Sequence, residues 1–213
     1  MNEELKNILK RVNQLFTKYG IKSVTMDDIS HELAISKKTL YQYVKDKGEL
    51  VSLIVDMEFE EKSTCFGEIE HAYVNAINEL YQVQKVINTI LKEHSPSSVY
   101  DLKKYYPEVH QKMNDMRRKK LMEFTMENLK KGKAEGLFRS TINDLLITKL
   151  QVQRIENTFD NDFLSVEEMT SPPIFIEMFN YHIRGIATEK GLIELEKVIG
   201  KLKSDYLKTN INI

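Results

Sequence analysis

Residues 25–47 decide the fold, and they read Thr-Met-Asp-Asp-Ile-Ser-His-Glu-Leu-Ala-Ile-Ser-Lys-Lys-Thr-Leu-Tyr-Gln-Tyr-Val-Lys-Asp-Lys. Apolar residues recur at helical spacing in two short runs, which predicts two short helices joined by a tight turn. Thr25 precedes Asp28 by three positions, a spacing close to that of a capping box, and Ser36 is a suitable N-cap for the second helix. The second helix opens with polar, basic and tyrosine side chains, the layout of a helix-turn-helix that inserts into the DNA major groove.

The rest of the chain predicts further helices, and with few breakers the expected fold class is all-α. An amphipathic helix from Leu5 to Tyr19 should end at Gly20, and Asp46 should cap the helix that follows the quoted segment. Later helices are expected at about 67–93, 98–105, 107–136, 143–159, 172–188 and 192–208, with a polar loop at 160–171 and Gly191 separating the last two helices. We therefore expect an N-terminal three-helix helix-turn-helix domain at 1–47 and a larger helical domain at 48–213.

Composition sets bounds on function. The chain has 213 residues, of which 41% are hydrophobic, and its net charge is −1, so it is not a generic polyanion binder. The charge is uneven, because residues 1–50 carry a balance of +2 and the remainder −3. A mildly basic head on an acidic body is consistent with local contact with phosphates.

Location and redox state follow from what the sequence lacks. Cys65 is the only cysteine, so no intrachain disulfide can form and a reducing compartment is expected. The sequence has no run of about 18 apolar residues and no signal-peptide pattern. We expect a cytoplasmic protein.

The second short helix has donors that suit base edges. Lys37 and Lys38 can donate to guanine O6 and N7, and Thr39 can contact a thymine methyl group. Gln42, one turn later on the same face, can bond an adenine edge. We expect Lys37, Lys38 and Gln42 to face bases.

Neighbouring side chains suit the phosphate backbone. Tyr41 and Tyr43 have hydroxyl groups that can donate to phosphate oxygens, and Lys47 lies at the start of the next helix, where the helix dipole favours anions. The simpler alternative is that Leu40, Tyr41 and Val44 are ordinary core and the lysines a solvated face. The N-caps, the turn and the polar cluster all lie at the spacing that a helix-turn-helix requires. This agreement favours DNA binding over the simpler alternative.

Residues 1–55 resemble the DNA-binding domain of TetR-family transcriptional regulators. The residues that carry this resemblance, at the family's spacing, are Thr25, Ile29, Leu33, Ile35, Ser36, Thr39, Leu40, Tyr41, Tyr43, Lys47 and Leu50. The resemblance implies that Thr25 belongs to the DNA-binding set together with Lys37, Lys38, Thr39, Tyr41, Gln42, Tyr43 and Lys47. The chain departs from the family pattern at Ser30 and Ala34, where alanine and the turn glycine are usual, and at Val44 and Gly48, where phenylalanine and an acidic residue are usual.

The resemblance extends weakly to residues 132–139 and 184–191, which look like a helix end and the junction of two dimerisation helices. It implies that residues 48–213 bind a ligand and form a homodimer. The expected ligand cavity is apolar and is lined by Met113, Met116, Phe124, Phe159 and Phe179. The expected dimer interface is a four-helix arrangement that includes Phe175, Phe179, Ile183, Leu195, Ile199 and Leu202. The same side chains could instead form ordinary core.

Other classes of site find little support. The five histidines are scattered without ligand spacing, and no phosphate loop or hydrolase motif occurs. We therefore expect no metal, no cofactor and no enzymatic activity. The sequence predicts a homodimeric DNA-binding regulator, a repressor released from a palindromic operator by a small hydrophobic ligand. The alternative is an all-helical ligand carrier or enzyme without a DNA role.

Overall fold

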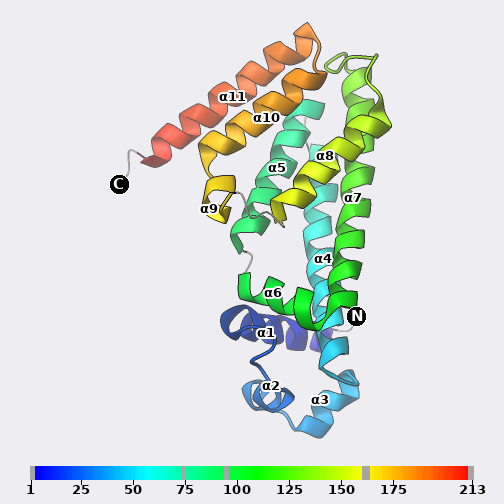
Figure 1. The fold of residues 1–213 in the computed structure, drawn as a ribbon, viewed down its shortest axis with the longest axis vertical. Coiled ribbons are helices and arrows are strands. Elements are labelled where there is room, and N and C mark those ends of the chain that lie inside the picture. Colours follow the sequence, from blue (N-terminus) through cyan, green and yellow to red (C-terminus); the bar gives the residue numbers. More distant parts are fainter. Residues whose placement is uncertain (1–2, 73–74, 94–95, 160–163, 211–213) are drawn as a thin grey trace. The chain divides into compact units, whose positions relative to one another are not determined.

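The structure is a computed structural model and describes residues 3–72, 75–93, 96–159 and 164–210. The described residues form eleven helices (Figure 1), which confirms the all-α fold class. The helices are α1 (Glu3–Tyr19), α2 (Met26–Leu33), α3 (Lys37–Tyr43), α4 (Lys47–Ala72), α5 (Ala76–Glu93), α6 (Pro96–Tyr105), α7 (Pro107–Ala134), α8 (Asp144–Phe159), α9 (Val166–Met169), α10 (Pro172–Ile186) and α11 (Glu189–Asn210). Within the described ranges the extended backbone pairing is a single antiparallel bridge, between Phe138 and Ala187.

The chain divides into two compact units. The head unit comprises Met1–Thr64 and His94–Arg117, and the body unit comprises Cys65–Glu93 and Arg118–Ile213. The long helices α4 and α7 each contribute residues to both units. This division concerns packing, and the functional boundary between residues 47 and 48 stays a prediction.

The core of the head unit is built from the apolar faces of α1 to α4 and α6. Leu9, Val12 and Phe16 of α1 are buried there with Ile29, Leu40 and Leu50. Gly20 follows α1 with φ of +82°, a conformation that glycine adopts without steric cost, so the predicted end of α1 is confirmed.

Both predicted N-caps in the quoted segment are present. The Thr25 hydroxyl accepts from the Asp28 amide at 3.2 Å, and the Asp28 carboxylate accepts from the Thr25 amide at 2.8 Å, which completes a capping box. The Ser36 hydroxyl accepts from the Thr39 amide at 3.0 Å. Each such cap contributes about 1 kcal/mol of stability.

The turn between α2 and α3 is a Schellman motif. The Ile35 amide donates to the Ser30 carbonyl at 3.0 Å, and the Ala34 amide donates to the His31 carbonyl at 3.1 Å. The motif places Ala34 in the left-handed region, with φ of 55° and ψ of 39°. Alanine at this position is strained, since its β-carbon approaches the backbone, and glycine is the usual residue there.

The body unit has its own core, drawn from α5, α7, α8, α10 and α11. Helices α10 and α11 run side by side (Figure 1). The segments 132–139 and 184–191 pack against each other, because the Thr188 hydroxyl donates to the Gly136 carbonyl at 2.7 Å and the Thr188 amide donates to the Leu137 carbonyl at 2.9 Å. A β-carbon at Gly191 would collide with that Leu137 carbonyl, so glycine is required at this close approach.

Three predicted boundaries were wrong. The helix expected at 67–93 is two helices, since α4 continues to Ala72 and α5 starts at Ala76, where Asn75 accepts from the Asn78 amide at 3.0 Å as a cap. The loop expected at 160–171 contains the short helix α9, and its residues 160–163 lie outside the described residues. Gly191 does not separate the last two helices, because it lies inside the first turn of α11 and Thr188 caps that helix.

We predict that Ala34→Gly stabilises the protein. The substitution removes left-handed strain from alanine and should raise the free energy of unfolding by about 1 kcal/mol, measured by urea denaturation of the full chain. Ala134→Gly at the end of α7 is the matched control and should give no gain, because Ala134 is helical. An unchanged or lower stability for Ala34→Gly would show that the turn is not strained.

Candidate nucleic-acid interface

Helix α3 presents one polar face outward. Leu40 is fully buried and anchors the helix to the head core, whereas Lys38, Tyr41 and Gln42 are exposed. Positions three and four apart lie on the same side of a helix, so these three exposed side chains form one outward surface. The group offers an ammonium, a phenol hydroxyl and a carboxamide to a partner.

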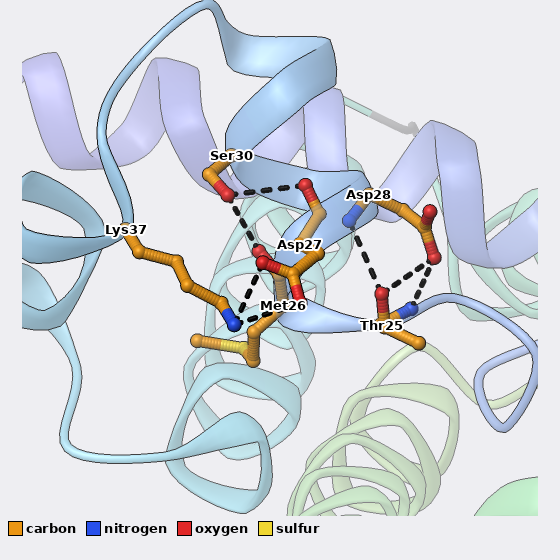
Figure 2. Close-up of polar contacts among 6 residues, drawn as sticks. All are labelled: Thr25, Met26, Asp27, Asp28, Ser30 and Lys37. Atoms are coloured by element: carbon orange, nitrogen blue, oxygen red, sulfur yellow. Dashed lines mark hydrogen bonds and ion pairs between the residues drawn. The ribbon is translucent and has the colours of Figure 1, made fainter.

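Lys37 is held by an acidic residue that the sequence interpretation did not single out. Its ammonium lies 2.7 Å from the Asp27 carboxylate, an ion pair that joins α3 to α2 (Figure 2). The hydrogen bond to Asp27 raises the pKa of Lys37. Both side chains are well exposed, so solvent screens the pair, it contributes little to stability, and it can open when a stronger anion is present.

The two threonines of the predicted DNA-binding set take part in capping. The Thr25 hydroxyl donates to the Asp28 carboxylate at 2.7 Å (Figure 2), and the Thr39 and Ser36 hydroxyls lie 2.8 Å apart. The hydrogen bonds from Thr25 lower the pKa of Asp28. These hydroxyls therefore fix the ends of α2 and α3, whatever they also contact.

Tyr43 is partly buried at the end of α3, and its hydroxyl bonds to the carboxylate of Glu4 on α1. That hydrogen bond is the main reason that the pKa of Tyr43 is raised. The hydroxyl is therefore already engaged in this structure, and a phosphate oxygen would have to replace Glu4 as its acceptor.

Lys47 bonds inside the head unit. Its ammonium donates to the Ile21 carbonyl at 2.5 Å and lies 3.4 Å from the Lys22 carbonyl, both in the loop between α1 and α2. Partial burial lowers the pKa of Lys47. This side chain links the first turn of α4 to that loop, and its predicted contact with phosphate stays a prediction.

Asp101 on α6 holds the same loop from another side. Its carboxylate accepts from the Lys22 amide at 2.8 Å, and the Lys22 ammonium donates to the Tyr105 hydroxyl at 2.8 Å. Sequence reasoning missed Asp101 and Asp27 alike, because both act through tertiary contacts that no local spacing encodes. The loop that precedes α2 is thus fixed by both α4 and α6.

The remaining departures from the family pattern are accommodated locally. Ser30 is buried, and its hydroxyl donates to the Met26 carbonyl at 2.8 Å and lies 3.1 Å from that of Asp27 (Figure 2). Val44 is buried at the end of α3. Gly48 lies in the first turn of α4, which Asp46 caps by accepting from the Glu49 amide at 2.8 Å, as predicted.

The predicted ligand-lining residues do not form one group. Met113 packs against the head core, and Met116 borders an open hollow along α7. Phe124 and Phe179 are buried in the body core, and the side chain of Phe159 lies outside the described residues. The cavity lined by these five residues stays a prediction.

The predicted dimer residues lie in the chain's own body core, with Leu202 packed against its margin. Phe175, Phe179, Ile183, Leu195 and Ile199 are all buried without a second chain. Among the described side chains of the same two helices, the exposed large apolar ones are Tyr181, which is 83% exposed, and Ile193, which is 64% exposed.

Other site types receive no support from the described ranges. They contain no group of three His, Cys, Asp or Glu side chains that could hold a metal ion. None of their helices combines the length and apolar character that crossing a membrane requires.

The head unit thus contains a capped helix, a three-residue turn and a second capped helix with an outward polar face, which together define a helix-turn-helix protein. Residues 8–54 match the family model described as bacterial regulatory proteins, tetR family. This match confirms, for residues 8–54, the resemblance to TetR-family regulators seen in the sequence.

Curated relatives agree in the same region. An HTH-type transcriptional regulator of Staphylococcus aureus (strain bovine RF122 / ET3-1) is 30% identical over 84 residues, and that of strain USA300 is 29% identical over the same length. The match covers 39% of this chain and 43% of each relative. The chain therefore spans less than half the length of the curated relatives it matches.

Solved structures share the fold over most of the chain. A transcriptional regulator from Cytophaga hutchinsonii superposes with a TM-score of 0.74 at 18% identity, over 88% of this chain and 100% of the other. AibR, solved with isovaleryl coenzyme A and operator DNA, superposes with a TM-score of 0.56 at 14% identity, over 84% of this chain and 97% of AibR. At these identities the likeness extends to the fold alone.

We predict that Lys47 stabilises the head unit before any partner binds. Lys47→Met removes a charged donor from two loop carbonyls and should lower the free energy of unfolding by about 1–2 kcal/mol in urea. Lys38→Met, the exposed control on α3, should change it by less than about 0.5 kcal/mol. Equal stability for the two variants would mean that Lys47 is not a structural link.

Proposed function

We propose that the chain is a homodimeric DNA-binding transcriptional regulator that places α3 in the major groove of an operator. The observation that carries this proposal is the outward surface of Lys38, Tyr41 and Gln42 on a helix anchored by buried Leu40. Side chains of this kind match base edges and phosphates. The match of residues 8–54 to the tetR family model adds support.

The eight candidate DNA contacts have different parts in this proposal. Lys38, Tyr41 and Gln42 are available at once, whereas Lys37 reaches DNA by leaving Asp27 for a stronger anion. Thr25 and Thr39 position the helix ends through their capping hydrogen bonds. Their methyl groups contact the DNA backbone or bases. Tyr43 and Lys47 approach phosphates from the end of α3 and the start of α4.

The test is a selection of binding sites from randomised DNA with the full chain, repeated with Gln42→Ala. The variant should lose preference at one position in each half-site by roughly 1–3 kcal/mol, because the carboxamide can pair with an adenine edge. Gln153→Ala, an exposed residue of α8, is the matched control and should leave the selected sequence unchanged. An unchanged preference with Gln42→Ala would contradict the placement of α3, and no selected sequence at all would contradict the function.

We further propose that two copies associate through the outward faces of α10 and α11. One short helix contacts only a few base pairs, so paired copies reading inverted half-sites give useful specificity. Tyr181 and Ile193 provide exposed apolar surface on these helices, and such surface favours association. This assignment moves the contact from the buried residues predicted earlier to the outward side chains of the same two helices.

Two substitutions of exposed apolar residues, Ile193→Glu and Leu146→Glu, test this association directly. Ile193→Glu should convert the dimer to a monomer at micromolar concentration, because association would bury an unpaired carboxylate. Leu146→Glu on α8 replaces a residue that is 54% exposed and should leave the dimer intact. Sedimentation measures both variants, and a monomeric wild type or a dimeric Ile193→Glu would refute this interface.

We also propose that the regulator is a repressor and that a small apolar ligand bound in the body unit weakens operator binding. Linkage requires that the operator weakens ligand binding by the same factor. AibR, which shares the fold, was solved with both an acyl coenzyme A and operator DNA, which supports coupling of this kind. The alternative, a ligand carrier without a DNA role, predicts ligand binding with no selected DNA sequence.

A further inference from the structure

The first turn of α2 carries two consecutive carboxylates with different partners. The Asp28 carboxylate accepts from the Thr25 amide at 2.8 Å and from the Thr25 hydroxyl at 2.7 Å, so it belongs to the capping box. Figure 2 shows the Asp27 carboxylate turned toward Lys37 instead, and both of its oxygens lie 2.7 Å from the Lys37 ammonium. Capping therefore accounts for Asp28 but not for Asp27.

Asp27 lies beside the end of α3 that a helix-turn-helix uses for reading bases. Its partner Lys37 is the first residue of α3. In a helix-turn-helix, the N-terminal residues of the second helix contact base edges, while the first helix crosses the DNA backbone. The Asp27 side chain is 71% exposed. An exposed carboxylate at this place adjoins the base edges that the proposed site assigns to Lys37.

The exchange of partners at Lys37 has a consequence for Asp27. When the Lys37 ammonium moves to DNA, the Asp27 carboxylate loses the donor that it has in this structure. An ionised carboxylate only accepts hydrogen bonds, and phosphate oxygens and acceptor atoms of bases repel it. The exchange is favourable only where the DNA supplies a new donor to Asp27, because an acceptor left without one is costly.

Among the bases, cytosine suits this requirement best. Its edge in the major groove presents the N4 amine as a donor, whereas guanine presents the acceptors N7 and O6, and thymine presents the acceptor O4 and a methyl group. Adenine has an N6 amine, but its N7 acceptor lies next to that amine and repels a carboxylate. Asp27 should therefore select cytosine and disfavour the other three bases.

We infer that Asp27 is a specificity-determining residue of the proposed DNA site, and that its carboxylate accepts from the N4 amine of one cytosine in each half-site when Lys37 moves to the DNA. This inference rests on the proposed function and adds an acceptor-only side chain to a contact set that otherwise lacks one. On DNA without that cytosine, the carboxylate faces acceptors and phosphates, so Asp27 weakens binding to other sequences.

The test is a selection of binding sites from randomised DNA with the full chain and with Asp27→Asn. The wild type should select cytosine at one position in each half-site. The variant should lose that preference at least about fivefold, because a carboxamide donates as well as accepts and so tolerates other bases. An unchanged cytosine preference in Asp27→Asn would overturn the inference.

Glu32→Gln is the matched control. It removes an equal charge from the last turn of the same helix, where the Glu32 side chain is exposed. This variant should select the wild-type sequence. A loss of the cytosine preference equal to that of Asp27→Asn would show that the net charge of α2 matters and that Asp27 reads no base.

Lys37→Met distinguishes a direct contact of Asp27 from a role in holding Lys37. The inference expects this variant to keep the selected cytosine, because the Asp27 carboxylate still meets the amine. If Asp27 acted only by positioning Lys37, both variants would lose the preference at the same position. That result would overturn the inference.

Binding to an unrelated duplex gives a second readout. At one fixed salt concentration, Asp27→Asn should bind a duplex without the selected sequence at least about twofold more tightly than the wild type, because a charge that repels phosphates is gone. Glu32→Gln should show a smaller gain. Equal or weaker binding by Asp27→Asn would contradict the inference.

The same selections keep this inference distinct from the proposed function. A wild type that selects an inverted repeat whose bases do not depend on Asp27 refutes only the role of Asp27 and leaves the regulator in place. A wild type that selects no sequence refutes the proposed function and the inference together.

Discussion

The turn at residues 34–36 is the constraint on which the head unit depends. Two backbone hydrogen bonds, from Ala34 to His31 and from Ile35 to Ser30, end α2 and set the direction in which α3 leaves it. Ser36 then caps α3, and Leu40 fixes the helix to the core, so that the next side chains point outward. The protein accepts a left-handed alanine at this turn, which means that surrounding packing maintains the geometry at some cost.

Local signals in the sequence were enough to predict where the short helices begin and end, and to predict the fold class. Thr25, Ser36 and Asp46 cap helices by bonding to amides three residues away, so their roles are encoded in spacing alone. The contacts of Lys37 with Asp27 and of Lys47 with Ile21 bridge separate elements, and no periodicity reveals them. The residues of the candidate DNA surface could therefore be predicted from the sequence. The sequence did not show which of their polar groups already bond to other residues of the chain.

In the body unit, apolar stripes on the helices could not distinguish core residues from dimer-interface residues, and the reason is physical. A stripe on α10 or α11 indicates that one face is buried but not whether the covering surface comes from the same chain or from another. In this fold the chain covers those stripes itself, and Tyr181 and Ile193 remain outside.

The central claim is that two copies of α3 read a DNA operator, and hydroxyl-radical footprinting tests it most directly. The DNA upstream of the chain's own gene is the first fragment to use, at low salt and then at physiological salt. The account predicts two protected patches on one face of the duplex, related by inverted symmetry and about one helical turn or a multiple apart. Uniform protection that disappears with salt, or no protection at all, would contradict it, because non-specific charge attraction alone gives no fixed pattern.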